Sequence, residues 1–477
     1  MKRNVSVVVG LAFMIFGRFL PAFPGLSASG MQVIGIFIGT LIMWLTIAIN
    51  WPSLLCIAML AMVPELTLNK LLVAGVGNST FSFLMFTFMC TYAISKTQFV
   101  KRCAIGFICS RLSRKGSWWF LISYCASVLV VGMVMSPVVL FVIYLPILDA
   151  ICKELGLTKD DSLANALILG QLICVGMACG MTPIAHVFPI MAMGFYQAAT
   201  GKAIGYGSYM SFAIPVGLIC FIALILLFRF VLRPDMSKIA SLDFDALEKT
   251  VTPMDKYEKS VLAIFFLVIV MWVVPDFIKG ILPGVSKFFA KQGTAFPPIL
   301  GASILCLLTL NGKPLLDFKE AMSKGLDWSS IIMAAGTLAL GSAMTDKTIG
   351  LTAWISHTIA PALSSMSFTM LVFVLVAWAA LMTNVSSNMV TVTVVTAIAI
   401  PLCNATNGAV NTAVVVSLIG MIASYAFATP PAHPAVALAI GSEKTTTLQV
   451  LKYGGSMMIV AIIVAVVVGY PLGLLAL

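Results

Sequence analysis

The chain has 477 residues, of which 61% are hydrophobic and 9% are charged, whereas a globular domain carries about 25% charged residues. This composition excludes a soluble fold. It also excludes a disordered chain, a disulfide scaffold and a nucleic-acid-binding domain, because too little charge is present to solvate a tail or line a groove. The net charge of +11 is typical of a membrane protein with basic cytoplasmic loops.

Taken in chain order, the apolar segments predict an all-α polytopic protein of the inner (plasma) membrane with about eleven transmembrane helices. Residues 1–30 form a retained N-terminal helix whose basic end lies in the cytoplasm. A first repeat follows at 31–232 with a hairpin near 118–147, then a hydrophilic linker at 233–260, then a second repeat at 261–477 with a hairpin near 370–402. Several segments are too short to span, which favours re-entrant or broken helices and therefore transport.

Three pairs of anchors recur at nearly constant separation and predict an internal duplication. If each half makes an odd number of crossings, the two repeats are inverted. The anchors are Lys96-Thr97 with Lys347-Thr348, Ser136 with Ser387, and the five residues from Thr182 to His186 with those from Thr429 to His433.

Each half contains a helix interrupted by proline. Proline removes a backbone donor and frees a carbonyl one turn back, so Pro183 and the pair Pro430-Pro431 should open the chain around 180–182 and 428–429. A packing kink is the alternative for each proline. The N–H groups that follow a break favour an anion, and the freed carbonyls before it favour a cation.

The hairpin turns differ between the halves. The second turn, 383–389, carries hydroxyls and amides between two apolar arms, and these need a substrate, an ion or backbone as partner. The alternative is a solvent-exposed loop. The first turn, 131–137, offers one hydroxyl, that of Ser136, and no amide.

The acidic residues indicate the charge of the substrate. None of the 17 falls in 132–146, 178–190, 383–401 or 426–438, whereas buried carboxylates are the usual ligands of transported metal ions and the usual proton relays. An anion therefore fits better than a cation. His186 and His433 either have a structural role or, when protonated, contribute positive charge that attracts the anion. His357 is expected at the surface or an interface.

At these residues the chain resembles the divalent anion/sodium symporter family, which carries dicarboxylates, citrate and sulfate. The likeness is most specific in Leu326-Asp327-Trp328, 336–341, 347–351, Ser387-Asn388 and 428–431. The resemblance implies inverted repeats with two re-entrant hairpins, a homodimer in lipid, and a transport domain that moves like an elevator against a scaffold. It implies no cofactor other than sodium as the coupling ion, and no enzymatic activity.

Together, the breaks, the turns and the resemblance predict which residues form the site. Substrate contacts are expected at Ser136, Thr182, Pro183, Ser387, Asn388, Thr429 and Pro430. A sodium ion is expected, by resemblance, at Thr383, Ser386, Asn388 and Ala428.

The first turn departs from the family pattern, because Pro137 and Val138 stand where Asn and Thr are expected, and Gly132 and Met181 occupy other sodium-site positions. Met389 replaces a family threonine in the second turn. The predicted function is secondary transport of small divalent organic anions, such as succinate, malate or citrate. Sodium-coupled transport and sodium-independent exchange both stay open, as does a carrier of a sulfate-like oxyanion. An ion channel and an intramembrane enzyme are the alternatives from other functional classes.

Overall fold

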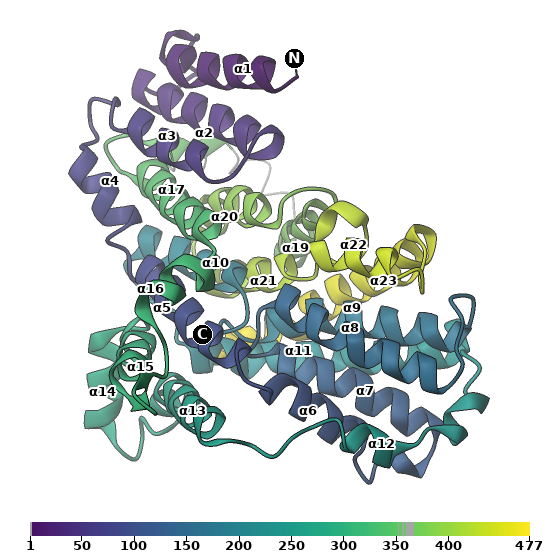
Figure 1. Ribbon diagram of the computed structural model, residues 1–477. Coiled ribbons are helices and arrows are strands. Elements are labelled where there is room, and N and C mark those ends of the chain that lie inside the picture. Colours follow the sequence, from purple (N-terminus) through teal and green to yellow (C-terminus); the bar gives the residue numbers. More distant parts are fainter. Residues whose placement is uncertain (1, 352, 355–356, 359–366) are drawn as a thin grey trace.

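The computed structural model describes residues 2–351, 353–354, 357–358 and 367–477, and almost all of its regular structure is helical (Figure 1). The described helices of the first half are α1 (Lys2–Phe16), η1 (Gly17–Phe19), α2 (Ala28–Thr46), α3 (Trp51–Leu60), α4 (Leu68–Gly75), α5 (Ser79–Ser95), α6 (Phe99–Ile108), η2 (Ser113–Lys115), α7 (Ser117–Gly132), α8 (Pro137–Glu154), α9 (Ser162–Met181), α10 (Val187–Thr200), α11 (Tyr206–Leu227) and η3 (Phe228–Leu232).

Two short helices lie between the halves, η4 (Ser237–Ser241) and α12 (Phe244–Glu248). The described elements of the second half are α13 (Lys256–Phe277), α14 (Pro283–Gln292), α15 (Phe296–Leu307), β1 (Thr309–Leu310), β2 (Lys313–Pro314), α16 (Phe318–Glu320), η5 (Ala321–Gly325), α17 (Trp328–Thr345), α19 (Phe368–Val385), α20 (Asn388–Asn404), α21 (Thr412–Ala423), η6 (Pro430–Ala432), α22 (Pro434–Gly441), α23 (Thr447–Val464), η7 (Ala465–Gly469) and α24 (Tyr470–Ala476). The two strands pair antiparallel.

Short polar side chains fix where many helices begin. Ser27, Asp255 and Asp327 each accept a hydrogen bond from a backbone N–H in the first turn of the helix that follows, α2, α13 and α17 respectively. Such caps satisfy donors that have no partner inside the helix. Helix α23 begins with a full capping box between Thr446 and Gln449.

Seven of the described helices are long and apolar enough to cross a membrane, and α4 with α5, bent by 42°, gives an eighth when counted as one span. Exposed large apolar residues follow one another one turn apart, as in Phe266 and Val270 of α13 and Ile459 and Ile463 of α23. These stripes suit contact with lipid chains. The polytopic helical class is therefore confirmed, and the count of about eleven crossings stays a prediction.

Both predicted breaks are present at the Thr-Pro pairs. Helix α9 ends at Met181 and α10 begins at Val187, while α21 ends at Ala423 and α22 begins at Pro434. Thr182 and Thr429, each before a proline, are extended with φ/ψ of −134/149° and −138/153°, the conformation that a following proline favours. The first break starts later than expected, since Gly180 is still helical.

The two halves contact each other reciprocally. Lys70 forms an ion pair with Asp346, and Lys96 Nζ lies 2.5 Å from Glu320 Oε2. Lys70 and Glu320 are 250 positions apart, as are Lys96 and Asp346, one residue less than the spacing of Lys96 and Lys347. Nearly equivalent positions therefore meet twice with the charges exchanged. The helices agree, because α4 packs against α17 and η5 packs against α5. A two-fold relation between the two halves would produce reciprocal contacts of this kind, and that relation stays a prediction.

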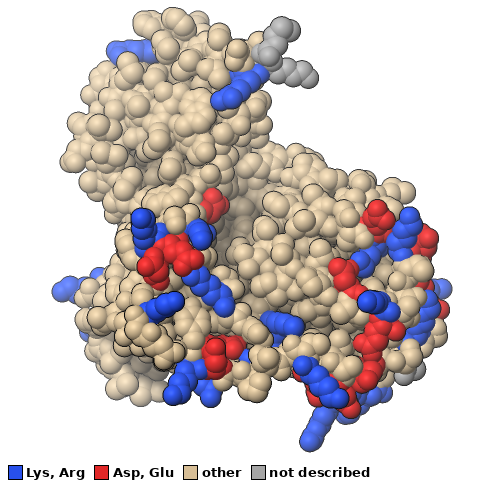
Figure 2. Space-filling model, viewed as in Figure 1, with Lys and Arg blue, Asp and Glu red and all other residues tan. Residues whose placement is uncertain are grey.

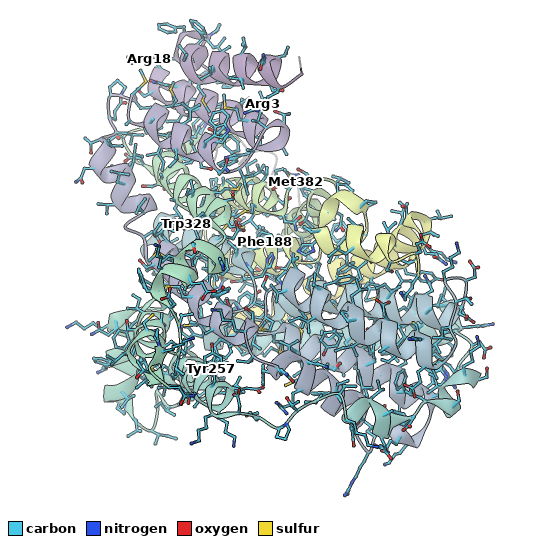
Figure 3. All side chains as sticks on the ribbon, viewed as in Figure 1. Arg3, Arg18, Phe188, Tyr257, Trp328 and Met382 are labelled. Carbon is cyan, nitrogen blue, oxygen red and sulfur yellow. The ribbon has the colours of Figure 1, made fainter. Side chains whose placement is uncertain are left out.

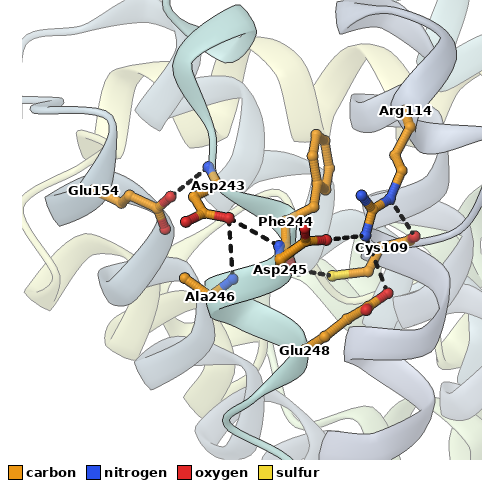
Figure 4. Close-up of polar contacts among 8 residues, drawn as sticks. All are labelled: Cys109, Arg114, Glu154, Asp243, Phe244, Asp245, Ala246 and Glu248. Carbon is orange, nitrogen blue, oxygen red and sulfur yellow. Dashed lines mark hydrogen bonds and ion pairs between the residues drawn. The ribbon is translucent and has the colours of Figure 1, made fainter.

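The segment between the halves is held against η2 and the end of α8 (Figure 4). Arg114 Nη2 donates to Asp245 at 2.8 Å and to Glu248 at 3.2 Å, and the Asp243 N–H donates to Glu154. Helix α13 begins at Lys256, where the Asp255 side chain caps it, so the last residues of the predicted linker, 233–260, are helical.

Candidate functional site

A cavity of about 580 Å³ lies where the two turns and the two breaks meet. Figure 2 shows a hollow near the middle of the face in view with a group of charged side chains at its margin, and Figure 3 places Phe188, one of the lining residues, near the middle of the molecule. The lining residues are Ile49, Phe88, Thr91, Tyr92, Ser95, Met135, Ser136, Pro137, Val138, Val139, Ala185, His186, Val187, Phe188, Lys324, Gly325, Leu326, Asp327, Ser330, Ser387, Asn388, Met389, Ala432, His433 and Pro434.

Four helix N-termini converge on this cavity. Helices α8, α10, α20 and α22 begin at Pro137, Val187, Asn388 and Pro434, and each of these residues lines it. The first N–H groups of a helix have no partner within the helix, and the helix dipole is positive at that end. The cavity therefore favours a negatively charged ligand over a positive one.

Ser136 and Ser387 occupy matching places at the two turns. Each directly precedes a helix, α8 or α20, with φ/ψ of −58/135° and −65/128° respectively. Neither side chain accepts a capping hydrogen bond from its own helix. Since both serines line the cavity, both hydroxyls are placed to contact a ligand there.

Buried polar atoms without partners gather at the same place. Among the described residues, Ser386 Oγ, Asn388 Oδ1 and His186 Nδ1 are buried and lack a hydrogen-bond partner. Asn388 is only 7% exposed. A buried polar atom left unpaired costs about 1–3 kcal/mol, which is the cost that a bound ligand or ion would remove.

The two threonines of the breaks face the turns rather than the cavity. Thr182 Oγ1 donates to the carbonyl of Met133, and Thr429 Oγ1 donates to the carbonyl of Asn384. Met133 and Asn384 are 251 positions apart, the same spacing as Ser136 and Ser387. Each break is thus tied to its turn by the same hydrogen bond. Neither threonine is among the lining residues, and neither are Pro183 and Pro430.

Asn384 makes the second turn much more strongly bonded than the first. Its Nδ2 donates to the carbonyls of Ala380 at 2.9 Å and Tyr425 at 3.0 Å, and its Oδ1 accepts from the Ala428 N–H at 2.8 Å. Sequence reasoning placed Asn384 in a polar turn without giving it a role. Met133, 251 positions earlier, has no amide that would have revealed the role.

The residues predicted to bind sodium lie together at this second turn. Thr383 Oγ1 donates to the Ala423 carbonyl at 2.7 Å and keeps lone pairs, while Ser386 Oγ and Asn388 Oδ1 are the unpaired buried oxygens. Oxygen ligands of this kind suit a hard cation. Ala428 offers its carbonyl, since its N–H is bonded to Asn384.

The matching positions of the first half do not fit a cation. Those positions are Gly132, Met135, Pro137 and Met181, whose side chains offer no oxygen ligand. In the part of the chain that the structure describes, no cluster of three His, Cys, Asp or Glu residues is arranged to hold a metal ion.

The cavity wall is not free of carboxylates, because the η5–α17 connection brings in Asp327 and Lys324. Both Asp327 oxygens accept from Ser330, through its N–H and its hydroxyl, so this carboxylate caps α17. At the margin, hydrogen bonds from Lys96 and Tyr92 hold the pKa of Glu320 below its usual range. Sequence reasoning looked for acids only in the turns and breaks and therefore missed this wall.

His186 and His433 both line the cavity, with ring centroids 6.3 Å apart. His433 Nδ1 accepts the Ala435 N–H at 3.1 Å, a structural role in the first turn of α22. His357 is exposed, as expected.

Solved transporters share the overall fold. MtrF of Neisseria gonorrhoeae, from a class of antimetabolite efflux pumps, superposes with a TM-score of 0.55 at 14% identity, covering 85% of this chain and 85% of its own. The YdaH transporter of Alcanivorax borkumensis gives 0.52 at 11% identity, covering 85% and 86%.

Sequence comparison is more specific. The sodium-dependent dicarboxylate transporter SdcS of Staphylococcus saprophyticus is 24% identical over 98% of this chain and 91% of its own length. The family model described as the sodium:sulfate symporter transmembrane region matches residues 1–475. Because that match spans nearly the whole sequence, the chain belongs to the sodium:sulfate symporter family of membrane transporters.

Proposed function

We propose that this protein is a secondary active transporter of small divalent organic anions, with succinate-like dicarboxylates as substrates. The convergence of four helix N-termini on one cavity carries the proposal, because it provides positive potential from four helix dipoles and, at α8, α10 and α20, N–H donors without a partner inside the helix. Ser136, Ser387 and Asn388 add polar side chains to the same space. The name of the relative SdcS, a sodium-dependent dicarboxylate transporter, supports this substrate class.

Sodium couples to transport, in this proposal, only through the second turn. Thr383, Ser386, Asn388 and Ala428 hold the ion, and its charge strengthens the site for an anion. The matching positions in the first half offer no side-chain oxygen, so a single sodium ion is expected rather than two. Exchange of one dicarboxylate for another without sodium is the alternative that this weak first site favours.

Inverted repeats and an elevator movement complete the proposal. The reciprocal ion pairs of Lys70 with Asp346 and Lys96 with Glu320 support a two-fold relation between 31–232 and 261–477. The turns and breaks would belong to the moving part, and α4, α5 and α17 to the fixed part. An assembly as a homodimer in the inner membrane, with residues 1–30 entering from the cytoplasm, belongs to the same proposal.

The test is uptake of labelled succinate into proteoliposomes by wild-type protein and by Asn388→Ala. One lost hydrogen bond to a charged ligand is worth about 1.5–3 kcal/mol, so uptake at low substrate should fall about tenfold or more. Asn69→Ala, at an exposed position of α4, is the control and should transport normally. Normal uptake by Asn388→Ala would refute the site, and counterflow with and without sodium separates symport from exchange.

An inorganic oxyanion is the second candidate substrate, and the family's description as sodium:sulfate symporters favours it. Helix N-termini bind sulfate as readily as carboxylate. Competition decides between the two: excess succinate should block uptake of labelled sulfate far more strongly than excess sulfate blocks uptake of succinate.

A further inference from the structure

The two halves place one histidine each at the same point of the cavity. His186 and His433 are 247 positions apart, directly precede α10 and α22, and adopt similar extended conformations with φ/ψ of −146/153° and −157/144°. Both rings line the cavity, and their centroids are 6.3 Å apart. A dicarboxylate between the turns and the breaks would therefore lie beside both imidazoles.

Their hydrogen bonds give the two rings different roles. Because His433 Nδ1 accepts the Ala435 N–H, the ring proton of neutral His433 is on Nε2, where it is a donor. His186 Nδ1 is buried and has no partner among the described residues, and the ring packs edge-on against Phe188 with centroids 4.0 Å apart. No protein hydrogen bond to Nδ1 fixes the protonation state of His186.

Among the described residues, neither histidine forms an ion pair with a carboxylate. Apart from the two histidines, the ionisable groups that line the cavity are Tyr92, Lys324 and Asp327, and the small void behind the rings adds Cys179. Asp327 is engaged with Ser330, and Lys324 Nζ lies 3.7 Å from a Glu320 oxygen. The lining parts of α8, α10, α20 and α22 carry no other ionisable side chain.

We propose that His186 binds a proton when the dianion enters and that this proton is transported with it. The proton leaves water or buffer on the side to which the cavity opens, binds the ring lone pair of His186, and returns to water with the anion on the other side. No covalent bond of the substrate changes. The imidazolium pairs with one carboxylate, and the Nε2–H of His433 donates to the anion.

This inference rests on the proposed function and adds a second coupling ion to it. The proton supplies positive charge beside the first turn, where the only side-chain hydroxyl is that of Ser136 and the matching cation ligands are missing.

Calorimetric titration of the purified protein with succinate, in buffers of different ionisation enthalpy, measures proton uptake on binding. Wild-type protein should take up about one proton per succinate, and His186→Gln should take up none. His433→Asn keeps an acceptor for the Ala435 N–H but loses the cavity donor, so it should bind more weakly with proton uptake unchanged. His357→Gln, at the exposed third histidine, is the matched control and should behave as wild type.

Transport gives an independent measurement in proteoliposomes that hold sodium at the same concentration on both sides of the membrane and contain a pH-sensitive dye. Succinate entry should acidify the lumen for wild type and His357→Gln, and His186→Gln should acidify it less for each succinate carried. Comparing the variants per succinate corrects for any succinate that enters already protonated. Equal proton uptake and equal acidification by His186→Gln and wild type would overturn the inference while leaving dicarboxylate transport intact. Absence of any succinate uptake by wild type would instead refute the proposed function.

Discussion

Removing the Asn384 side chain should loosen the second turn from its break. In Asn384→Ala the Ala428 N–H and the Tyr425 carbonyl lose their partners, at 2.8 Å and 3.0 Å, in a buried region. Each buried group left unpaired costs about 1–3 kcal/mol, so the two together should lower the free energy of unfolding by about 2–6 kcal/mol. The Ala380 carbonyl lies within α19 and adds little.

Chemical denaturation in detergent micelles, followed by tryptophan fluorescence, measures this change, and succinate uptake reports its effect on transport. The matched control is Met133→Ala, which trims the equivalent residue of the first turn without removing a side-chain hydrogen bond. Uptake should fall in Asn384→Ala because Ser387 and Asn388 follow directly on the loosened turn. Unfolding and uptake equal to those of the control would refute the role assigned to Asn384.

Three further outcomes are expected. Lys96→Met should lower the melting temperature at neutral pH, because hydrogen bonds from Lys96 and then Tyr92 lower the pKa of Glu320, which stabilises only while ionised. The difference from wild type should shrink as the pH falls below the usual Glu pKa of about 4.3 and vanish once it is below the lowered pKa of Glu320; a difference that persists in stronger acid would contradict the pairing. Gly454→Ala should impair folding and uptake, since a Cβ there would lie 2.6 Å from the Phe427 carbonyl. Gly455→Ala, whose Cβ meets nothing within 4 Å, should be neutral or stabilising by about 0.5–1 kcal/mol. Equal behaviour of the two variants would argue against the packing of α23 on the second break. Arg114→Ala should speed limited proteolysis between α12 and α13, and an unchanged cleavage rate would show that the contacts in Figure 4 do not hold this segment.

The sequence located the interrupted elements well because their causes are local. Proline before α10 and near α22, and serine before α8 and α20, act on the backbone within a few residues, so the places of both breaks and both turns followed from composition and spacing. The family was also identified correctly from short motifs, and the match over residues 1–475 confirms it.

The rest of the cavity depends on contacts between distant segments, which a single sequence does not reveal. The wall from α5 and the η5–α17 connection, with Tyr92, Lys324 and Asp327, reaches the turns only through helix packing. Asn384 was unremarkable by pattern because the residue 251 positions earlier is Met133, and the side-chain hydrogen bonds of Asn384 reach residues 41 to 74 positions away as well as Ala380 in its own helix. Each sequence motif spans only a few residues, so it could not report which distant segments pack together.

The exchanged charges of the reciprocal ion pairs also affect which halves of the chain can pair with each other. If the first half paired with a second copy of itself in the same geometry, Lys70 would face Lys96, and two second halves would set Glu320 against Asp346. Like charges at such a distance repel, so both symmetric assemblies are penalised and only the joining of unlike halves is favoured.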